Sequence, residues 1–161
     1  MSDITIRPAN EADVPLILRF IRELAIYEKL EHEVVATEDG LRTTLFGVKP
    51  AAEVLIASLR GEPVGFALFF SNFSTFLGQA GLYLEDLYVV PEARGKGAGL
   101  ALLRELARIA IARGYGRLEW WVLDWNQPSI DFYKALGAEP MDDWTVYRLG
   151  GEAMGRLAAG S

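Results

Sequence analysis

The chain of 161 residues contains no cysteine and a single histidine. The lack of cysteine excludes disulfide bridges, thiolate metal sites and a cysteine nucleophile in one step. His32 lies in the polar stretch Leu-Glu-His-Glu, and one imidazole without thiolates argues against a transition-metal site, so we expect no bound metal. A Ser-His-Asp hydrolase would have to use His32, and the Gly-x-Ser-x-Gly elbow of such enzymes is missing.

Long apolar runs and basic clusters are also missing. No segment approaches the ~20 apolar residues that span a bilayer, and no basic-then-apolar leader is visible at the start, so we expect a cytoplasmic protein without membrane association. The net charge of −6, with no cluster among the 16 Lys and Arg residues, argues against nucleic-acid binding. An acidic surface attracts cationic substrates such as amines, although mild acidity also serves solubility alone.

Hydrophobic periodicity predicts one α/β domain over residues 1–150 and a loose tail at 151–161. Asn10 and Thr37 are suitable N-caps for two of its helices. Three strands in succession exclude simple doubly wound alternation. The expected strands cover 3–7, 53–59, 63–70, 81–90, 117–123 and 144–149, and the expected helices cover 10–27, 37–46, 100–113 and 128–136.

A strand that ends near Pro91 feeds a glycine-rich turn, which then opens a helix. The first N–H groups of a helix have no partner inside it, and the helix dipole favours an anion there. Gly95 and Gly97 allow positive φ and a close approach of a ligand to the backbone. The pattern therefore indicates a phosphate site, with a plain turn as the alternative. The spacing matches neither a Walker loop nor a dinucleotide-binding fingerprint.

The motif Arg-x-x-Gly-x-Gly at residues 94–99, followed by Asn126, Tyr133 and Gly137 in order, resembles the GNAT family of N-acetyltransferases. The resemblance runs from about residue 4 to residue 150. It implies acetyl-CoA as cosubstrate. It also implies the GNAT fold, in which helices flank a twisted, mixed and mostly antiparallel sheet whose parallel central strands splay apart to admit the cofactor.

The chain is also similar to the diamine acetyltransferases. The residues that carry this similarity are Tyr27 and Glu28, the segment 83–86 and the segment 125–133. This subfamily comprises spermidine/spermine enzymes and thialysine-type relatives. The likeness implies a small cationic amine as substrate and a homodimer. The segment 72–76 lacks the acidic residue that polyamine enzymes carry there, which favours a shorter amine such as a lysine analogue.

Glu85 is the first candidate for the general base. An alkyl ammonium with a pKa near ~10.4 is mostly charged at neutral pH and must lose a proton before it attacks a thioester. Glu85 interrupts an apolar strand, and a buried charge needs a partner that a cationic substrate would supply. Strict alternation would turn Asp86 to the opposite face. The alternative is an edge position or a salt bridge to an arginine.

Tyr133 is the candidate acid, because the resemblance places this tyrosine beside the thioester, where a phenol with a pKa near ~10 would protonate the leaving sulfur. The alternative is a core aromatic. Asn126 would bind the cofactor arm or cap the following helix. Trp120, Trp121 and Trp125 would offer cation–π contacts, although core packing is the simpler expectation.

The remaining site residues follow from the resemblance. Leu87 and Val89 would bind the cofactor through main-chain groups. The implied substrate contacts are Tyr27, Glu28, Glu85 and Asp142. The implied cofactor contacts are Leu87, Tyr88, Val89, Arg94, Gly95, Lys96, Gly97, Ala98, Gly99, Leu100, Asn126, Ser129 and Tyr133. Acetylation of protein lysines or N-termini, and a non-catalytic CoA-binding module, are the alternative functions.

Overall fold

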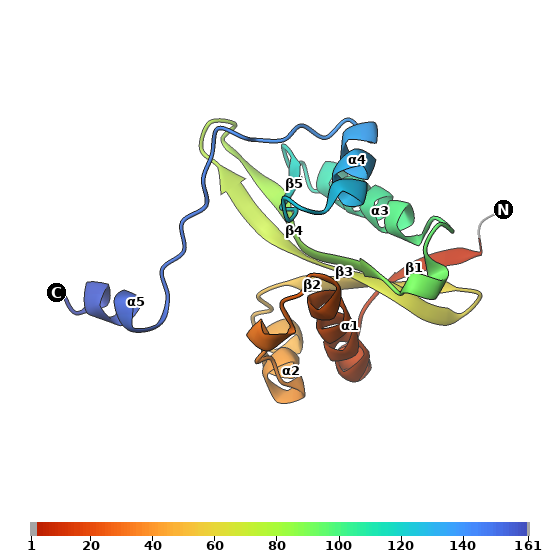
Figure 1. Ribbon diagram of the computed structural model, residues 1–161, viewed down its shortest axis with the longest axis horizontal. Coiled ribbons are helices and arrows are strands. Elements are labelled where there is room, and N and C mark those ends of the chain that lie inside the picture. The colour runs from red at the N-terminus through yellow and green to blue at the C-terminus, as the bar shows by residue number, and fades with distance from the viewer. Residues whose placement is uncertain (1–2, 161) are drawn as a thin grey trace. The chain divides into compact units, whose positions relative to one another are not determined.

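A computed structural model describes residues 3–160 (Figure 1). The chain forms two compact units that meet in sequence at Leu123 and Asp124. A single domain over residues 1–150 stays a prediction. Within the described residues, no helix has both the length and the apolar character required to cross a membrane.

The first unit is built on a mixed sheet of five strands in the order β1-β2-β3-β4-β5. Strands β1 to β4 pair antiparallel, and β4 pairs parallel with β5. The predicted mixed, mostly antiparallel sheet is therefore confirmed. The strands are β1 (Ile4–Pro8), β2 (Glu53–Leu59), β3 (Glu62–Ser74), β4 (Gln79–Val89) and β5 (Leu118–Trp120).

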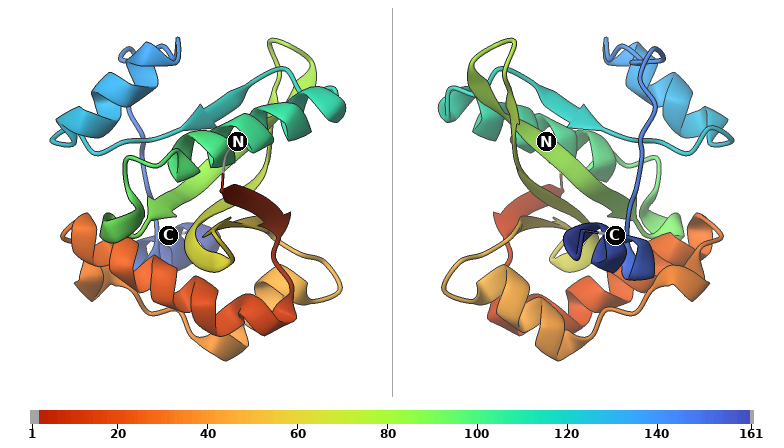
Figure 2. Two further views of the ribbon diagram at one scale, coloured as in Figure 1. Left: turned by 90° about the vertical axis from the view of Figure 1, so that its right-hand side faces the viewer. Right: turned by 90° about the vertical axis from the view of Figure 1, so that its left-hand side faces the viewer.

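Helices cover both faces of this sheet. Figure 2 shows α1 and α2 on one face and α3, the crossover between β4 and β5, on the other. On the α1 face, the rings of Phe20 and Phe66 stack with centroids 5.6 Å apart. On α3, Leu102 and Leu106 are fully buried. The helices are α1 (Val14–Tyr27), α2 (Glu38–Phe46) and α3 (Ala98–Ala112), with short 3-10 turns η1 (Glu11–Asp13), η2 (Glu31–Glu33) and η3 (Pro91–Ala93).

The predicted caps form at the starts of the N-terminal helical segments. Asn10 Oδ1 accepts a hydrogen bond from the backbone N–H of Ala12 (2.9 Å) and caps η1, which runs directly into α1. Thr37 Oγ1 accepts from the N–H of Gly40 (3.1 Å) at the start of α2. These bonds satisfy N–H groups that the helical segments themselves cannot pair.

A β-bulge interrupts β4 at Glu85. Asp86 lies opposite Leu68 on β3, whereas Leu84 lies opposite Phe69, so Glu85 has no partner in the ladder. An extra residue of this kind shifts the alternation of side chains along the strand. Leu84 and Asp86 therefore lie on opposite faces although they are two residues apart, so alternation breaks at this point. Separation of Glu85 from Asp86 onto opposite faces stays a prediction.

The parallel pairing of β4 with β5 is short. Only Leu82–Leu84 of β4 pairs with β5, which ends at Trp120 rather than at the predicted residue 123. Within residues 3–160, no strand pairs with the last residues of β4 on the edge where β5 lies. This arrangement agrees with the expected divergence of the parallel strands, and it leaves main-chain groups near Leu87 and Val89 without a strand neighbour on that edge.

The second unit holds α4 (Gln127–Ala135) and α5 (Gly151–Ala158). The predicted strand at 144–149 is wrong, because these exposed residues have no regular structure. Alternating apolar residues favour a strand, but a strand also needs a partner for its hydrogen bonds, and the described part of this unit contains none. Of the predicted loose tail, residues 151–158 instead form α5, residues 159–160 form a turn, and residue 161 lies outside the described residues.

The sequence of α5 explains why it is helical. Glu152 in the first turn and Arg156 in the last turn complement the helix dipole. Their side chains also lie 3.7 Å apart as an i,i+4 ion pair. No described residue of α5 is buried, and Met154 and Leu157 point apolar side chains toward solvent.

Candidate active site

The glycine-rich turn between β4 and α3 has the conformation expected of a phosphate loop. Gly95 and Gly97 have φ angles of 78° and 94°, in the left-handed region that favours glycine. A Cβ atom at either position would meet nothing within 4 Å, so the space beside the turn is open. Helix α3 begins at Ala98 and has no side-chain cap, and its first N–H groups therefore remain available to an anion.

These residues fit the pyrophosphate of CoA. Ala98, Gly99 and Leu100 form the first turn of α3, and the exposed Lys96 adds a positive charge in the turn. Such a concave run of main-chain donors next to a cation is a general anion-binding arrangement. The contacts predicted for these residues stay predictions.

The side chain of Arg94 is directed to α1. Its Nε donates to the carbonyl oxygen of Val89 (2.9 Å), and its Cζ lies 5.0 Å from the ring centroid of Tyr27. The backbone N–H of Arg94 donates to the carbonyl of Pro91 (3.2 Å). Arg94 therefore holds the turn against α1, which the motif alone did not indicate.

At the end of β4, a cofactor would meet main-chain groups rather than side chains. Leu87 and Val89 are half-buried, and Tyr88 is buried. The ring of Tyr88 packs 5.9 Å from that of Phe20, and its hydroxyl donates to Glu23 (2.8 Å). Burial and this hydrogen bond raise the pKa of Tyr88 to about 12. The side chain of Tyr88 belongs to the core, so a cofactor would contact this residue only through its backbone.

Three carboxyl groups interact electrostatically: Glu28 at the C-cap of α1, and Glu85 and Asp86 at the β4 bulge. Burial, then the charges of Glu85 and Glu28, raise the pKa of Asp86 to about 7. Burial and the charge of Glu85 also raise the pKa of Glu28. Glu85 itself is exposed, whereas the other two are half-buried. Carboxylates held together in this way attract a cation, and their mutual repulsion raises the pKa of a proton acceptor toward neutral pH.

Aromatic rings border the three carboxyl groups. Burial, followed by the charges of Glu85, Asp86 and Glu119, raises the pKa of Tyr83, so its hydroxyl stays protonated at neutral pH. The rings of Tyr83 and Trp121 meet edge to face with centroids 5.7 Å apart. Trp121 is 59% exposed, so the expectation of core packing is wrong for this tryptophan.

The sequence pattern does not indicate that Tyr83 and Asp86 lie on one face of the sheet. The bulge explains why. Tyr83 lies opposite Phe70 and Asp86 lies opposite Leu68. Phe70 and Leu68 are two residues apart on β3 and share a face, so Tyr83 and Asp86 share that face as well. Regular alternation over three residues would have separated them.

The other predicted site residues belong to the second unit. Asn126 is 6% exposed, and its Oδ1 accepts from the N–H of Ser129 (3.4 Å) as the cap of α4, which confirms the helix-cap interpretation. Tyr133 is half-buried on α4, with its ring 5.7 Å from that of Phe132. Asp142 is exposed. The joint action of these residues with Glu85 stays a prediction.

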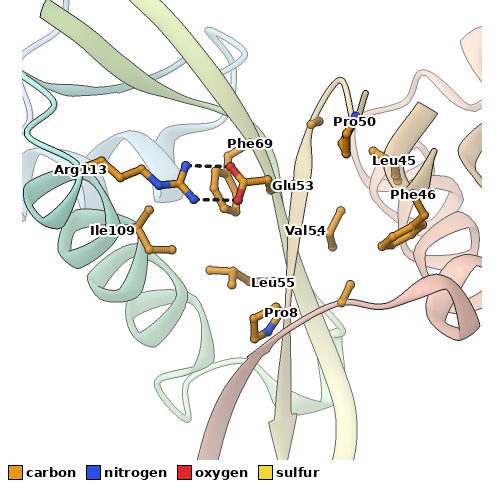
Figure 3. Close-up of a pocket in the computed structure, with 12 residues that line it drawn as sticks. Pro8, Leu45, Phe46, Pro50, Glu53, Val54, Leu55, Phe69, Ile109 and Arg113 are labelled. Atoms are coloured by element: carbon orange, nitrogen blue, oxygen red, sulfur yellow. Dashed lines mark hydrogen bonds and ion pairs between the residues drawn. The ribbon is translucent and has the colours of Figure 1, made fainter. Parts of the chain in front are cut away.

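A separate pocket of about 260 Å³ lies beyond the end of β1 and contains none of the predicted site residues (Figure 3). Its walls include Leu45, Phe46 and Ile109, and Arg113 donates to both carboxylate oxygens of Glu53 at 2.8 Å. Because these two charges satisfy each other, the pocket offers little polar chemistry for a ligand.

Comparison with known proteins identifies the fold and the reaction class. The model of the acetyltransferase (GNAT) family matches residues 20–138. A solved integron cassette protein from the mobile metagenome of V. cholerae superposes with a TM-score of 0.80 at 29% identity, covering 98% of this chain and 99% of that one. An aminoglycoside acetyltransferase from a soil metagenome, solved with sisomicin, shares the fold with a TM-score of 0.75 at 18% identity, covering 91% of this chain and 97% of that one.

Curated relatives extend the match over the whole chain. A thialysine N-epsilon-acetyltransferase of Bos taurus is 43% identical over 169 residues, covering 98% of this chain and 99% of the relative. An L-ornithine N5-acetyltransferase of Arabidopsis thaliana is 33% identical, covering 92% of this chain and 85% of the relative. These matches support N-acetylation of an amine. With the family model and these relatives in agreement, the chain belongs to the GNAT family of acetyltransferases.

Proposed function

We propose that the protein transfers the acetyl group of acetyl-CoA to the primary amine of a small cationic metabolite, such as a diamine, a polyamine or a lysine analogue. The observation that carries this proposal is the mutual repulsion of Glu28, Glu85 and Asp86. Tyr27, next to Glu28, lies under the guanidinium of Arg94 from the glycine-rich turn. The amine-acetylating relatives from Bos taurus and Arabidopsis support the same reaction class.

The carboxyl cluster accounts for recognition of the amine. Asp86 and Glu28 have raised pKa values because burial and neighbouring negative charges disfavour ionisation. An ammonium group placed among them would relieve this repulsion, so the site favours a cation over a neutral molecule. Tyr27, beside Glu28 at the end of α1, would contact the carbon chain of the acceptor.

The chemical step divides between two residues. Glu85, through a water molecule, takes one proton from the bound ammonium, and the neutral amine then forms a C–N bond with the acetyl carbon. As the C–S bond breaks, Tyr133 donates its phenolic proton to the leaving sulfur. The nitrogen gives up its second proton, which returns through water to the Tyr133 phenolate, and a neutral amide is left. Acetyl-CoA supplies the activated acyl group, held by the turn 94–100 and by main-chain groups of Leu87 and Val89. Asn126 and Ser129 are proposed to contact the pantetheine arm.

A short acceptor fits this site better than a long polyamine. The arm of the β3–β4 hairpin has no acidic residue at 72–76. The nearest carboxylate on β5, Glu119, already accepts from Asn72 Nδ2 (3.3 Å) and pairs with Arg117 (3.2 Å). Because the Glu119 carboxylate is already paired, the second ammonium of a long polyamine would have to displace Asn72 or Arg117 in order to bind it. Asp142 is the proposed contact for the far end of the acceptor.

Steady-state assays with acetyl-CoA and a panel of thialysine, lysine, ornithine, short diamines, spermidine and lysine-containing peptides test this proposal. We expect the highest kcat/KM for a short α-amino acid or diamine, with mono-acetylated product by mass spectrometry. Glu62→Gln, an exposed strand substitution, serves as the matched control for Glu85→Gln. Turnover of peptides alone, or of no amine, would contradict the proposal.

We also propose a cytoplasmic homodimer. The support for the dimer is the exposed apolar C-terminal segment, in which the side chains of Trp144, Val146 and Tyr147 are all exposed. Exposed apolar groups of this kind mark interaction surfaces. Sedimentation equilibrium of the intact chain and of a Trp144→Ser, Tyr147→Ser variant tests it. A dimer that dissociates in the variant is expected, and a monomeric wild-type chain at all concentrations would exclude it.

A further inference from the structure

Arg94 connects the phosphate turn to the acceptor side of the site. Its guanidinium lies over the ring of Tyr27, with 5.0 Å from Cζ to the centroid, and 5.8 Å from the centroid of Tyr88. Its Nε also donates to Val89 O (2.9 Å), the last residue of β4. One side chain thus contacts the last residue of β4 and the helix residue next to Glu28.

A second contact fixes the same region of α1. Tyr88 donates its hydroxyl proton to Glu23 Oε1 (2.8 Å), and Glu23 pairs with Arg19 (3.2 Å). Glu23 and Tyr27 are one helical turn apart, so they lie on one face of α1. Tyr88 and Arg94 therefore contact neighbouring turns of the same face of α1 and hold them against the end of β4. A movement of the turn that carries Arg94 would consequently shift the ring of Tyr27.

We propose that Arg94 is a positioning residue that couples occupation of the phosphate turn to the acceptor site at Tyr27 and Glu28. The inference rests on the proposed function for the identity of the two ligands. An anion bound by the main chain of 95–100 orders the turn, which fixes Arg94 and, through the cation–π contact, the Tyr27 ring. By thermodynamic reciprocity, the acceptor would strengthen cofactor binding by the same factor.

A set of matched variants separates this role from direct cofactor binding. We expect Arg94→Gln to raise the KM for the amine by about two- to fivefold, the range of an exposed cation–π contact, with little change in kcat. Arg94→Lys, which keeps a cation, should restore part of the effect. Tyr27→Leu also removes the proposed contact with the acceptor, so it should raise this KM at least as much as Arg94→Gln, and the double variant should be no worse than Tyr27→Leu alone. Arg104→Gln, an exposed arginine of α3, is the control.

Amide hydrogen exchange gives a readout that does not depend on turnover. CoA should slow exchange both in the turn and in residues 22–28 of the wild-type chain, whereas in Arg94→Gln it should protect the turn alone. If this pattern appears although no amine is acetylated, the proposed function fails and the coupling stands. Protection confined to the turn in the wild-type chain would overturn the coupling. A large loss of CoA affinity in Arg94→Gln with an unchanged amine KM would also overturn it, because Arg94 would then be a direct cofactor ligand.

Discussion

Asp86 lies directly opposite Leu68 in the β3–β4 ladder, so a half-buried carboxyl group shares a sheet face with a leucine. The apolar surroundings and the charges of Glu85 and Glu28 hold its pKa at about 7, above the ordinary value of 3.8. Between these pH values the folded chain keeps a proton that the unfolded chain has lost. The free energy of unfolding therefore falls as the pH rises from about 4 to about 7.

Asp86→Asn should remove this pH dependence, because the amide cannot ionise. We expect the variant to gain stability over the wild type between about pH 4 and pH 7, reaching on the order of 1–3 kcal/mol at pH 8. Thermal melts at pH 4.5 and pH 8 measure the difference, with Glu62→Gln as control. An equal change in melting temperature at both pH values would show that Asp86 does not titrate in this range.

Glu85→Gln should slow acetylation most at neutral pH. The variant lacks the proton acceptor, and we expect roughly a hundredfold loss of kcat/KM at pH 7, within the usual range of general base catalysis. At alkaline pH more of the amine is already neutral, so the loss should shrink. Initial rates from pH 6.5 to pH 9.5 measure this, and a loss that is the same at every pH argues for a binding role instead.

Tyr133→Phe removes the proposed proton donor while keeping the ring. We expect kcat to fall by roughly ten- to a thousandfold, while the KM values and the melting temperature change little. Phe132→Leu, at the neighbouring position of α4, controls for packing. Single-turnover measurements separate transfer from product release, and an undiminished rate of transfer would remove Tyr133 from the mechanism.

Gly97→Ala and Gly99→Ala form a matched pair in the phosphate turn. Gly97 has a φ of 94°, so alanine there is strained, and we expect a loss of about 1 kcal/mol in stability and weaker CoA binding. At Gly99, within α3, a Cβ would lie 3.9 Å from Val89 Cγ2, an ordinary contact. Alanine there should stabilise the chain without ligand by up to about 1 kcal/mol. Thermal melts and CoA titration measure both, and equal stability changes would contradict the assigned turn conformation.

The local patterns predicted much of the first unit. Asn10 and Thr37 cap helical segments as expected because capping depends on neighbouring residues alone. The crossover through α3 to a parallel strand also followed from the order of the elements. The positive φ angles of Gly95 and Gly97 were predictable because glycine adopts this region without strain.

Features that depend on distant partners escaped prediction. The bulge at Glu85 is set by the register of β3 against β4, and no periodicity along β4 alone reveals it. The strand expected at 144–149 is rich in apolar residues, but residues 124–160 contain no neighbouring strand. The contact of Arg94 with Tyr27 joins residues far apart in the sequence, so the motif around Arg94 could not show it.

The bulge in β4 lets this strand carry one residue more than its partner while the faces of the sheet stay in order. Deleting Glu85 would close the ladder into a regular one and leave Leu84 opposite Phe69 and Asp86 opposite Leu68, so both side chains would keep the faces that they occupy now. A one-residue insertion or deletion elsewhere in β4 would instead send the side chains beyond it to the opposite face. An engineer could therefore shorten this strand only at Glu85, and would do better to change the rest of the proposed acceptor wall by substitution.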